Sequence, residues 1–154
     1  MNGNLPSALY KKLSISGVIV SLFAVYILLT PGISRGQDQG KEKAAIAAAE
    51  AWLALVDAGK YDESWAQAAG YFKNALTEEK WAQALNGVRK PLGNPVSREV
   101  KTSQYATSLP GAPDGQYVII QFQTSFANKA SAVETVTPAL DNDGKWRVSG
   151  YFIK

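Results

Sequence analysis

The chain has 154 residues, of which 46% are apolar and 19% charged, and it contains neither cysteine nor histidine. This length suits one small domain. Without those two residue types the chain lacks a thiol nucleophile, a Ser-His-Asp triad, a disulfide and the usual ligands of zinc. The formal charge of +3 comes from residues 1–36, which hold three basic residues and no acid. The rest of the chain is neutral, so no nucleic-acid partner is predicted.

The first segment carries the features of an export signal. Lys11 and Lys12 precede an apolar run at 13–30, which is long enough to cross a bilayer and also fits the apolar part of a signal peptide. Small residues before Gln37 offer a cleavage site. Residues 1–36 are therefore predicted to be a cleaved signal peptide or an uncleaved membrane anchor. Both alternatives place the domain outside the cytoplasm, either periplasmic or anchored to the inner membrane, with membrane contact only through this segment.

A long helix follows a short polar stretch. Residues 37–43 are polar and are predicted to form a tether before a single domain at 44–154. The sequence from Lys43 to Ala58 is rich in helix-forming residues, and its larger apolar residues repeat at helical spacing. These residues are Ala45, Ala49, Trp52, Leu53 and Val56. They predict a helix that buries one face.

Two shorter helices are predicted next. Asp62 can cap a helix that is broken at Gly70, and Thr77 can cap another that ends at Pro91. Acidic residues follow Thr77 directly, in the first turn, where the helix dipole favours negative charge. Trp81, Leu85 and Val88 form the apolar stripe of that last helix.

After Pro95 the apolar residues alternate instead, as they do in half-buried strands. The predicted strands cover 96–105, 117–126, 133–140 and 146–153, and short polar turns separate them. Strands joined by short turns form an antiparallel meander. The predicted fold class is α+β, with N-terminal helices packed on one face of a four-stranded antiparallel sheet.

A series of residues from Trp65 to Ile153 carries a family resemblance. The series comprises Trp65, Trp81, Arg89, Pro91, Gly93, Ser97, Arg98, Leu109–Gly111, Pro113, Gly115, Tyr117, Phe126, Glu134, Gly144 and Trp146–Ile153. It resembles the bacterial domain-of-unknown-function family numbered four thousand and nineteen, over about residues 44–154. The resemblance implies an exported protein with no assigned activity. The element order is also similar to the nuclear-transport-factor-two-like (cystatin-like) cone fold, whose enzymes commonly use a His or Asp dyad.

Arg98 and Glu134 are the main candidates for a site. The predicted strand faces put Arg98 with Val96 and Val100, and Glu134 with apolar neighbours on its own strand. If both faces turn toward the helices, a buried guanidinium and a buried carboxylate should pair. One interpretation is the polar floor of a ligand pocket, in which Arg98 clamps a carboxylate or phosphate. The other, which we favour from the residues alone, is a structural ion pair.

Three further residues are candidates for ligand binding. Arg89 continues an apolar helical stripe, so its head either meets the last carbonyls of the helix or forms a second cation at the same site. Tyr117 and Tyr151 fall on strand faces with polar or mixed neighbours, where they would line a pocket or an interface. Trp52, Trp81 and Trp146 are assigned to the core, and Trp146 is expected to share a face with Val148 and Phe152.

No motif indicates a metal or cofactor. In the cluster at 141–144 the EF-hand alignment fails, because Ala139 and Gly150 would stand at ligand positions. The cluster is predicted to be a turn. The preferred function is a non-catalytic module for an unknown small ligand or protein partner. The alternatives are a cone-fold hydrolase or isomerase that uses Glu134 or Asp57 as base, and a structural subunit that pairs through its exposed sheet face.

Overall fold

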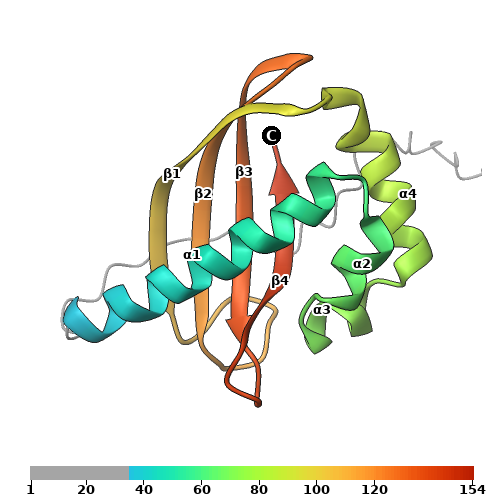
Figure 1. The fold of residues 1–154 in the computed structure, drawn as a ribbon. Helices are drawn as coiled ribbons and strands as arrows, with labels where there is room; N and C mark the ends of the chain where they lie inside the picture. The colour runs from blue at the N-terminus through green and yellow to red at the C-terminus, as the bar shows by residue number, and fades with distance from the viewer. Residues whose placement is uncertain (1–34) are drawn as a thin grey trace, which may run out of the picture.

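The computed structural model describes residues 35–154, and the helices precede the strands along the chain (Figure 1). In this range the helices are α1 (Arg35–Asp57), α2 (Tyr61–Ala66), α3 (Gly70–Ala75), α4 (Glu78–Val88) and the 3-10 helix η1 (Lys90–Leu92). The strands are β1 (Pro95–Ala106), β2 (Tyr117–Phe126), β3 (Lys129–Leu140) and β4 (Trp146–Ile153). The predicted α+β class is confirmed. The predicted signal or anchor run at 13–30 lies outside the described residues, and no helix within 35–154 is long and apolar enough to cross a membrane.

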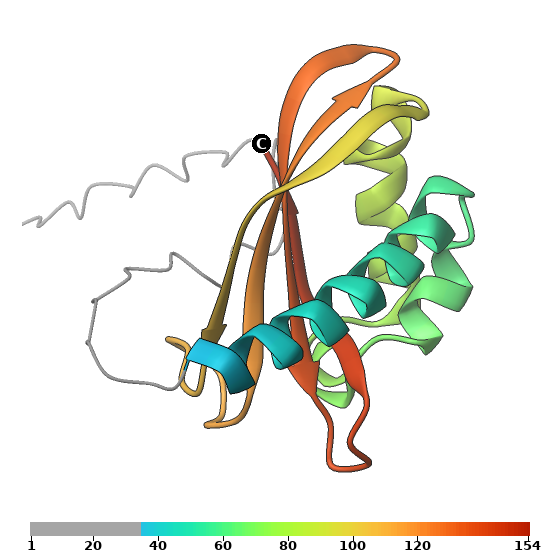
Figure 2. The same cartoon turned by 60° about the vertical axis from the view of Figure 1, so that its left-hand side comes forward.

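The sheet is the predicted meander. Its order is β1-β2-β3-β4, and each neighbouring pair is antiparallel. α1 crosses the sheet diagonally, and the shorter helices pack beside the β4 edge (Figure 1). Figure 2 shows that the helices lie on the same side of the sheet. We call the face that they cover the inner face and the opposite one the outer face.

α1 begins earlier than the sequence predicts. Residues 37–43, predicted as a polar tether, are part of this helix. Polar side chains in this stretch reach β1: Lys41 donates to the Tyr105 hydroxyl at 3.1 Å, and Ser103 donates to Glu42 at 2.5 Å. These contacts explain why a polar stretch without an apolar face is ordered as helix. Further along α1 the predicted apolar face is confirmed as buried.

The middle helices differ more from prediction. Asp62 lies in the first turn of α2, and the residue before the helix, Lys60, makes no side-chain cap. The predicted helix ends early, at Ala66, and at Ala69 the backbone is extended and its N–H donates to the Val148 carbonyl of β4 at 2.8 Å. α3 was not predicted. The cap at Thr77 is confirmed, since its hydroxyl accepts from the Lys80 N–H at 3.4 Å.

β-bulges change which residues face the helices. Two successive residues of β3 pair with Gly150 and Val148 of β4. The residue between them is therefore extra, and it interrupts the alternation of side chains between the two faces of the sheet. Tyr151 therefore turns inward and is buried, whereas Phe152, predicted to share a face with Trp146 and Val148, turns to the outer face.

Bulges in β1 have a similar effect. The first leaves Val96, which was predicted to face the helices, 72% exposed. The second follows Val100 and turns Ser103 and Tyr105 inward, where they meet α1. The simple alternation predicted for this strand is therefore wrong at both ends.

Aromatic side chains fill the core beside β4. The ring of Trp52 lies 5.7 Å from that of Trp81 and 5.4 Å from that of Tyr151, and Phe72 packs edge-on against Trp81 at 5.1 Å. Trp52 and Trp81 are buried as predicted. Their N–H groups are satisfied by Ser64: Trp52 donates to its carbonyl at 2.7 Å, and Trp81 donates to its hydroxyl at 2.9 Å.

Candidate functional site

Four charged side chains meet at the C-terminal end of α1, and we call them the charge network. Asp57 ends α1, Arg89 follows α4, Arg98 lies on β1 and Glu134 on β3. The Nε of Arg98 lies 2.7 Å from Glu134, and its two terminal nitrogens lie 2.7 and 3.0 Å from the oxygens of Asp57. Arg89 donates to Asp57 at 2.8 Å. Positive and negative side chains alternate along the network, in the order Arg89, Asp57, Arg98 and Glu134, and the four charges sum to zero.

Glu134 is the most deeply buried member, with 0% exposure. Besides Arg98, its Oε2 accepts from the Thr124 hydroxyl at 2.6 Å, and its Oε1 accepts from the Tyr151 hydroxyl at 2.6 Å. Both carboxylate oxygens are therefore hydrogen-bonded by protein groups, which is what a buried carboxylate requires. Burial raises the pKa of Tyr151 well above 10, and the adjacent Glu134 charge adds to the effect, so the hydroxyl remains a donor.

Arg89 combines the two roles that the sequence left open. Its Nη1 donates to the Gly93 carbonyl just beyond the helix at 2.6 Å, and its Nη2 donates to Asp57. The guanidinium stacks on the Phe126 ring, 4.4 Å from the centroid. Its side chain is only 4% exposed, and its buried Nε has no partner among the described residues. Arg89 is thus a second cation of the same network.

The network holds Asp57 in the charged form. Burial by itself raises the pKa of Asp57, but hydrogen bonds from Arg98 and then Arg89 outweigh it and hold that pKa below 3.8. Burial lowers the pKa of Arg98, but the hydrogen bonds to Asp57 and Glu134 raise it far above its ordinary value. Asp57 and Arg98 therefore stabilise each other in their charged forms.

The predicted pairing of Arg98 with Glu134 is present, but the sequence did not indicate that Asp57 bridges two arginines. A signal for it existed. The last turn of α1 has no basic residue, and an acid there is opposed by the helix dipole. Such an acid needs a cation from elsewhere in the fold, and Arg89 and Arg98 supply it.

The two tyrosines predicted for a pocket or interface are both buried. Tyr151, placed by the bulge of β4, faces the helices and not the mixed face predicted for it. Tyr117 lies on the outer face as predicted, but the loop between β1 and β2 covers it. Its hydroxyl donates to the Pro113 carbonyl at 2.7 Å, and it packs with Leu109 and Ala139. Tyr117 and Tyr151 do not lie together, and neither presents an exposed ring.

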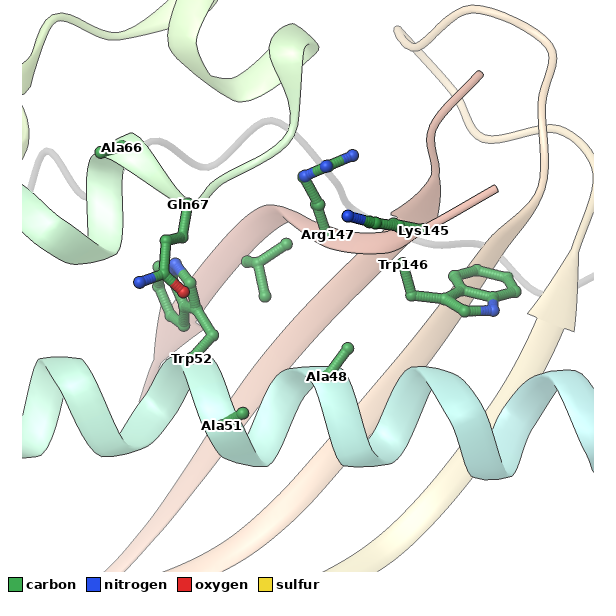
Figure 3. A pocket seen from close by; sticks show the side chains of 9 residues that line it. Ala48, Ala51, Trp52, Ala66, Gln67, Lys145, Trp146 and Arg147 are labelled. Atoms are coloured by element: carbon green, nitrogen blue, oxygen red, sulfur yellow. The ribbon is translucent and has the colours of Figure 1, made fainter. Parts of the chain in front are cut away.

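A cleft opens elsewhere, between α1 and the start of β4, and we call it the α1–β4 cleft. Its volume is about 440 Å³. Figure 3 shows Trp52 and Trp146 at opposite ends, small side chains of α1 between them, and the basic side chains of Lys145, just before β4, and Arg147, on β4, across from the helix. The lining residues are Ala48, Ala51, Trp52, Ala66, Gln67, Lys145, Trp146, Arg147 and Val148. No member of the charge network lines it.

The turn beside this cleft is stabilised by ion pairs. Arg147 donates to Asp141 at 2.9 Å and to the two oxygens of Asp143 at 2.8 and 2.7 Å. Gly144 supplies the positive φ of +77° that the turn requires. The predicted turn at 141–144 is confirmed. Of the cleft residues, the sequence placed Trp52 and Trp146 in the core, with Val148 on the face of Trp146, and proposed none for a site, because nothing in the pattern shows that α1 stands away from β4 here.

The comparisons agree with the resemblance carried by the sequence. The model of the family described as "Protein of unknown function (DUF4019)" matches residues 48–151. The chain belongs to this family. The DUF4019 match covers Asp57, Arg89, Arg98 and Glu134 as well as the whole α1–β4 cleft. No curated protein and no solved structure matches the chain.

Proposed function

We propose that this DUF4019 protein is a non-catalytic, exported module that binds a small ligand in the α1–β4 cleft. The observation that carries the proposal is the contrast between the two polar regions of the domain. The charge network is closed on itself by hydrogen bonds of 2.6 to 3.0 Å. The cleft, in contrast, is open and combines two indole side chains with polar side chains at its rim.

The size and lining of the cleft support a small-molecule ligand. Sites for such ligands commonly measure about 300–1,000 Å³ and combine apolar walls with a few polar groups. Trp52 and Val148 are buried core residues, so this part of the lining is fixed by packing. The other wall consists of alanines on α1, whose small side chains leave the space open.

The closed network supports a non-catalytic role. A general base must reach a substrate proton, either directly or through one water. Glu134 has both oxygens occupied by protein donors, and Asp57 is held between two arginines. The proposed export rests on Lys11, Lys12 and the apolar run at 13–30.

Filling the cleft tests the proposal. Ala51 lines the cleft, whereas Ala54 is exposed on α1 away from it, so Ala51→Leu and Ala54→Leu are matched variants of one helix. The probes are 4-phenylbutyrate, 4-phenylbutanol and 4-phenylbutylamine, followed by tryptophan fluorescence of the full-length protein. We expect at least one probe to bind the wild type and Ala54→Leu, with a loss of tenfold or more, about 1.4 kcal/mol, in Ala51→Leu. If no probe binds the wild type, or if both variants behave alike, the proposal is wrong.

A further inference from the structure

The interior and the rim of the α1–β4 cleft differ in chemistry. The floor of the cleft is formed by Trp52 and Val148, whose exposed fractions are 4% and 1%, and the half-buried Ala48 and the exposed Ala51 continue this apolar surface along α1. This part offers no charge and only apolar contact. A ligand that fills it must therefore present an apolar body, aromatic or aliphatic.

The rim of the cleft presents hydrogen-bond donors. Within the described part of the chain, the Lys145 ammonium, the Trp146 indole N–H and the Gln67 side-chain amide have no hydrogen-bond partner. Two of these three groups can only donate, and the amide can donate as well. Figure 3 shows Gln67 beside Trp52 and Lys145 near Trp146 at the other end of the cleft, so the donors do not converge. A ligand group that meets Lys145 must accept hydrogen bonds.

Neither acid near the rim forms an ion pair with the Lys145 ammonium, although the charge of Lys145 helps to lower the pKa of Asp143. Both Asp141 and Asp143 are engaged by Arg147 at 2.7 to 2.9 Å. Within residues 35–154, Lys145 is thus the cation of this rim without an ion-pair partner, whereas Arg147 is bonded to two carboxylates. A carboxylate can accept a charge-assisted hydrogen bond from the Lys145 ammonium, and such a bond is stronger than a hydrogen bond between neutral groups.

We infer that the α1–β4 cleft takes a small organic carboxylate, with its apolar body between Trp52 and Trp146 and its carboxylate on Lys145. This inference rests on the proposed function and names its ligand class. Figure 3 shows the arrangement: Lys145 and Arg147 lie on the side of the cleft that faces the alanines of α1. The charges of Lys145, Arg147, Asp141 and Asp143 sum to zero, so the carboxylate is recognised by direct contact with Lys145 and not by a net charge of the rim. The affinity should therefore depend only weakly on salt.

The three probes differ only in the end group and therefore test the charge. We expect the full-length protein to bind 4-phenylbutyrate about five- to tenfold more tightly than 4-phenylbutanol, and 4-phenylbutylamine least tightly. Lys145→Gln should remove the advantage of the acid and leave the affinity for the alcohol within twofold. Lys80→Gln, at an exposed lysine on α4 outside the cleft, is the matched control and should bind as the wild type does.

The outcomes separate the inference from the function on which it rests. If the alcohol or the amine binds as tightly as the acid, or if Lys145→Gln leaves acid binding unchanged, the carboxylate assignment is overturned while a binding cleft stands. Loss of acid binding in Lys80→Gln would also overturn it. If none of the three probes binds the wild type, both the proposed function and this inference fail.

Discussion

At the scale of single residues, the charge network is where this domain is most sensitive to change. Replacing a whole buried ion pair by apolar residues is often neutral, whereas removing one partner costs about 3–5 kcal/mol because the other charge is left uncompensated. Glu134 has the strictest requirement, since it is fully buried and accepts from Arg98, Thr124 and Tyr151. The network therefore fixes the relative positions of β1, β3 and the end of α1.

Glu134→Gln should destabilise the fold strongly. The amide replaces one accepting oxygen by a donor, so Tyr151, Thr124 or Arg98 loses its acceptor, and the network gains a net positive charge. We expect the free energy of unfolding to fall by about 3 kcal/mol in urea denaturation. Glu99→Gln, at an exposed position on β1, should change it by less than about 0.5 kcal/mol. Equal effects of the two substitutions would show that the network does not act as a structural brace.

The network should also make the domain sensitive to acid. The pKa of Asp57 is lowered below 3.8 in the folded state, so the native protein binds fewer protons there than the unfolded chain does. The stability that Asp57 contributes is present above 3.8 and is lost as pH falls through the lowered pKa. Urea denaturation at several pH values between 6 and about 2.5 should show this loss, and Asp57→Asn should show a shallower one. An identical pH profile in Asp57→Asn would contradict the assignment.

At the scale of elements, periodic residue patterns predicted the regular parts of the helices and strands, but not the bulges that interrupt the strands. The face of α1 and the extents of β2 and β4 follow from periodicity, and the Thr77 cap follows from local chemistry. The bulges of β1 and β4 leave no such mark, because a single extra residue is visible only against the partner strand. For that reason the pairing of Arg98 with Glu134 was predictable and the inward position of Tyr151 was not.

The connection from α4 into β1 depends on a backbone conformation that favours glycine. Gly93 has φ +76°, a Cβ there would lie 3.1 Å from that of Ala127, and its carbonyl accepts from Arg89. Gly93→Ala should therefore lower the free energy of unfolding by about 1–2 kcal/mol. Gly87→Ala, inside α4 and with open space around it, should raise it by about 0.5–1 kcal/mol. Thermal denaturation of both variants shows whether each substitution lowers or raises stability. A stabilising effect of Gly93→Ala would refute this account.

At the scale of the whole molecule, one layer of helices covers one sheet face, and this arrangement leaves two polar regions with opposite character. The charge network lies under the end of α1 and is closed by its own partners. The α1–β4 cleft opens where α1 passes the start of β4 (Figure 3). Strand and helix patterning pointed to the first region through Arg98, Glu134 and Arg89. The second depends on the path of α1 over the sheet, which the sequence does not encode locally.

The domain should lie outside the cytoplasm. Lys11 and Lys12 before the apolar run at 13–30 favour an amino terminus inside and a domain outside, whether or not the segment is cleaved. Alkaline phosphatase, which is active only after export, should be active when fused after Lys154 of the full chain. The same fusion without residues 1–34 should be inactive. Activity in both fusions, or in neither, would contradict export by this segment.

The most direct test of the account is a heteronuclear NMR titration of the full-length protein with 4-phenylbutyrate. We predict that chemical-shift changes concentrate on the α1–β4 cleft, with the indole N–H of Trp146 and the amides of Ala48 and Ala51 among the largest. The guanidinium signal of Arg98 should stay where it is, because its partners are within the protein. Changes centred on Arg98 and Glu134, or no localised change at saturating probe, would contradict the account.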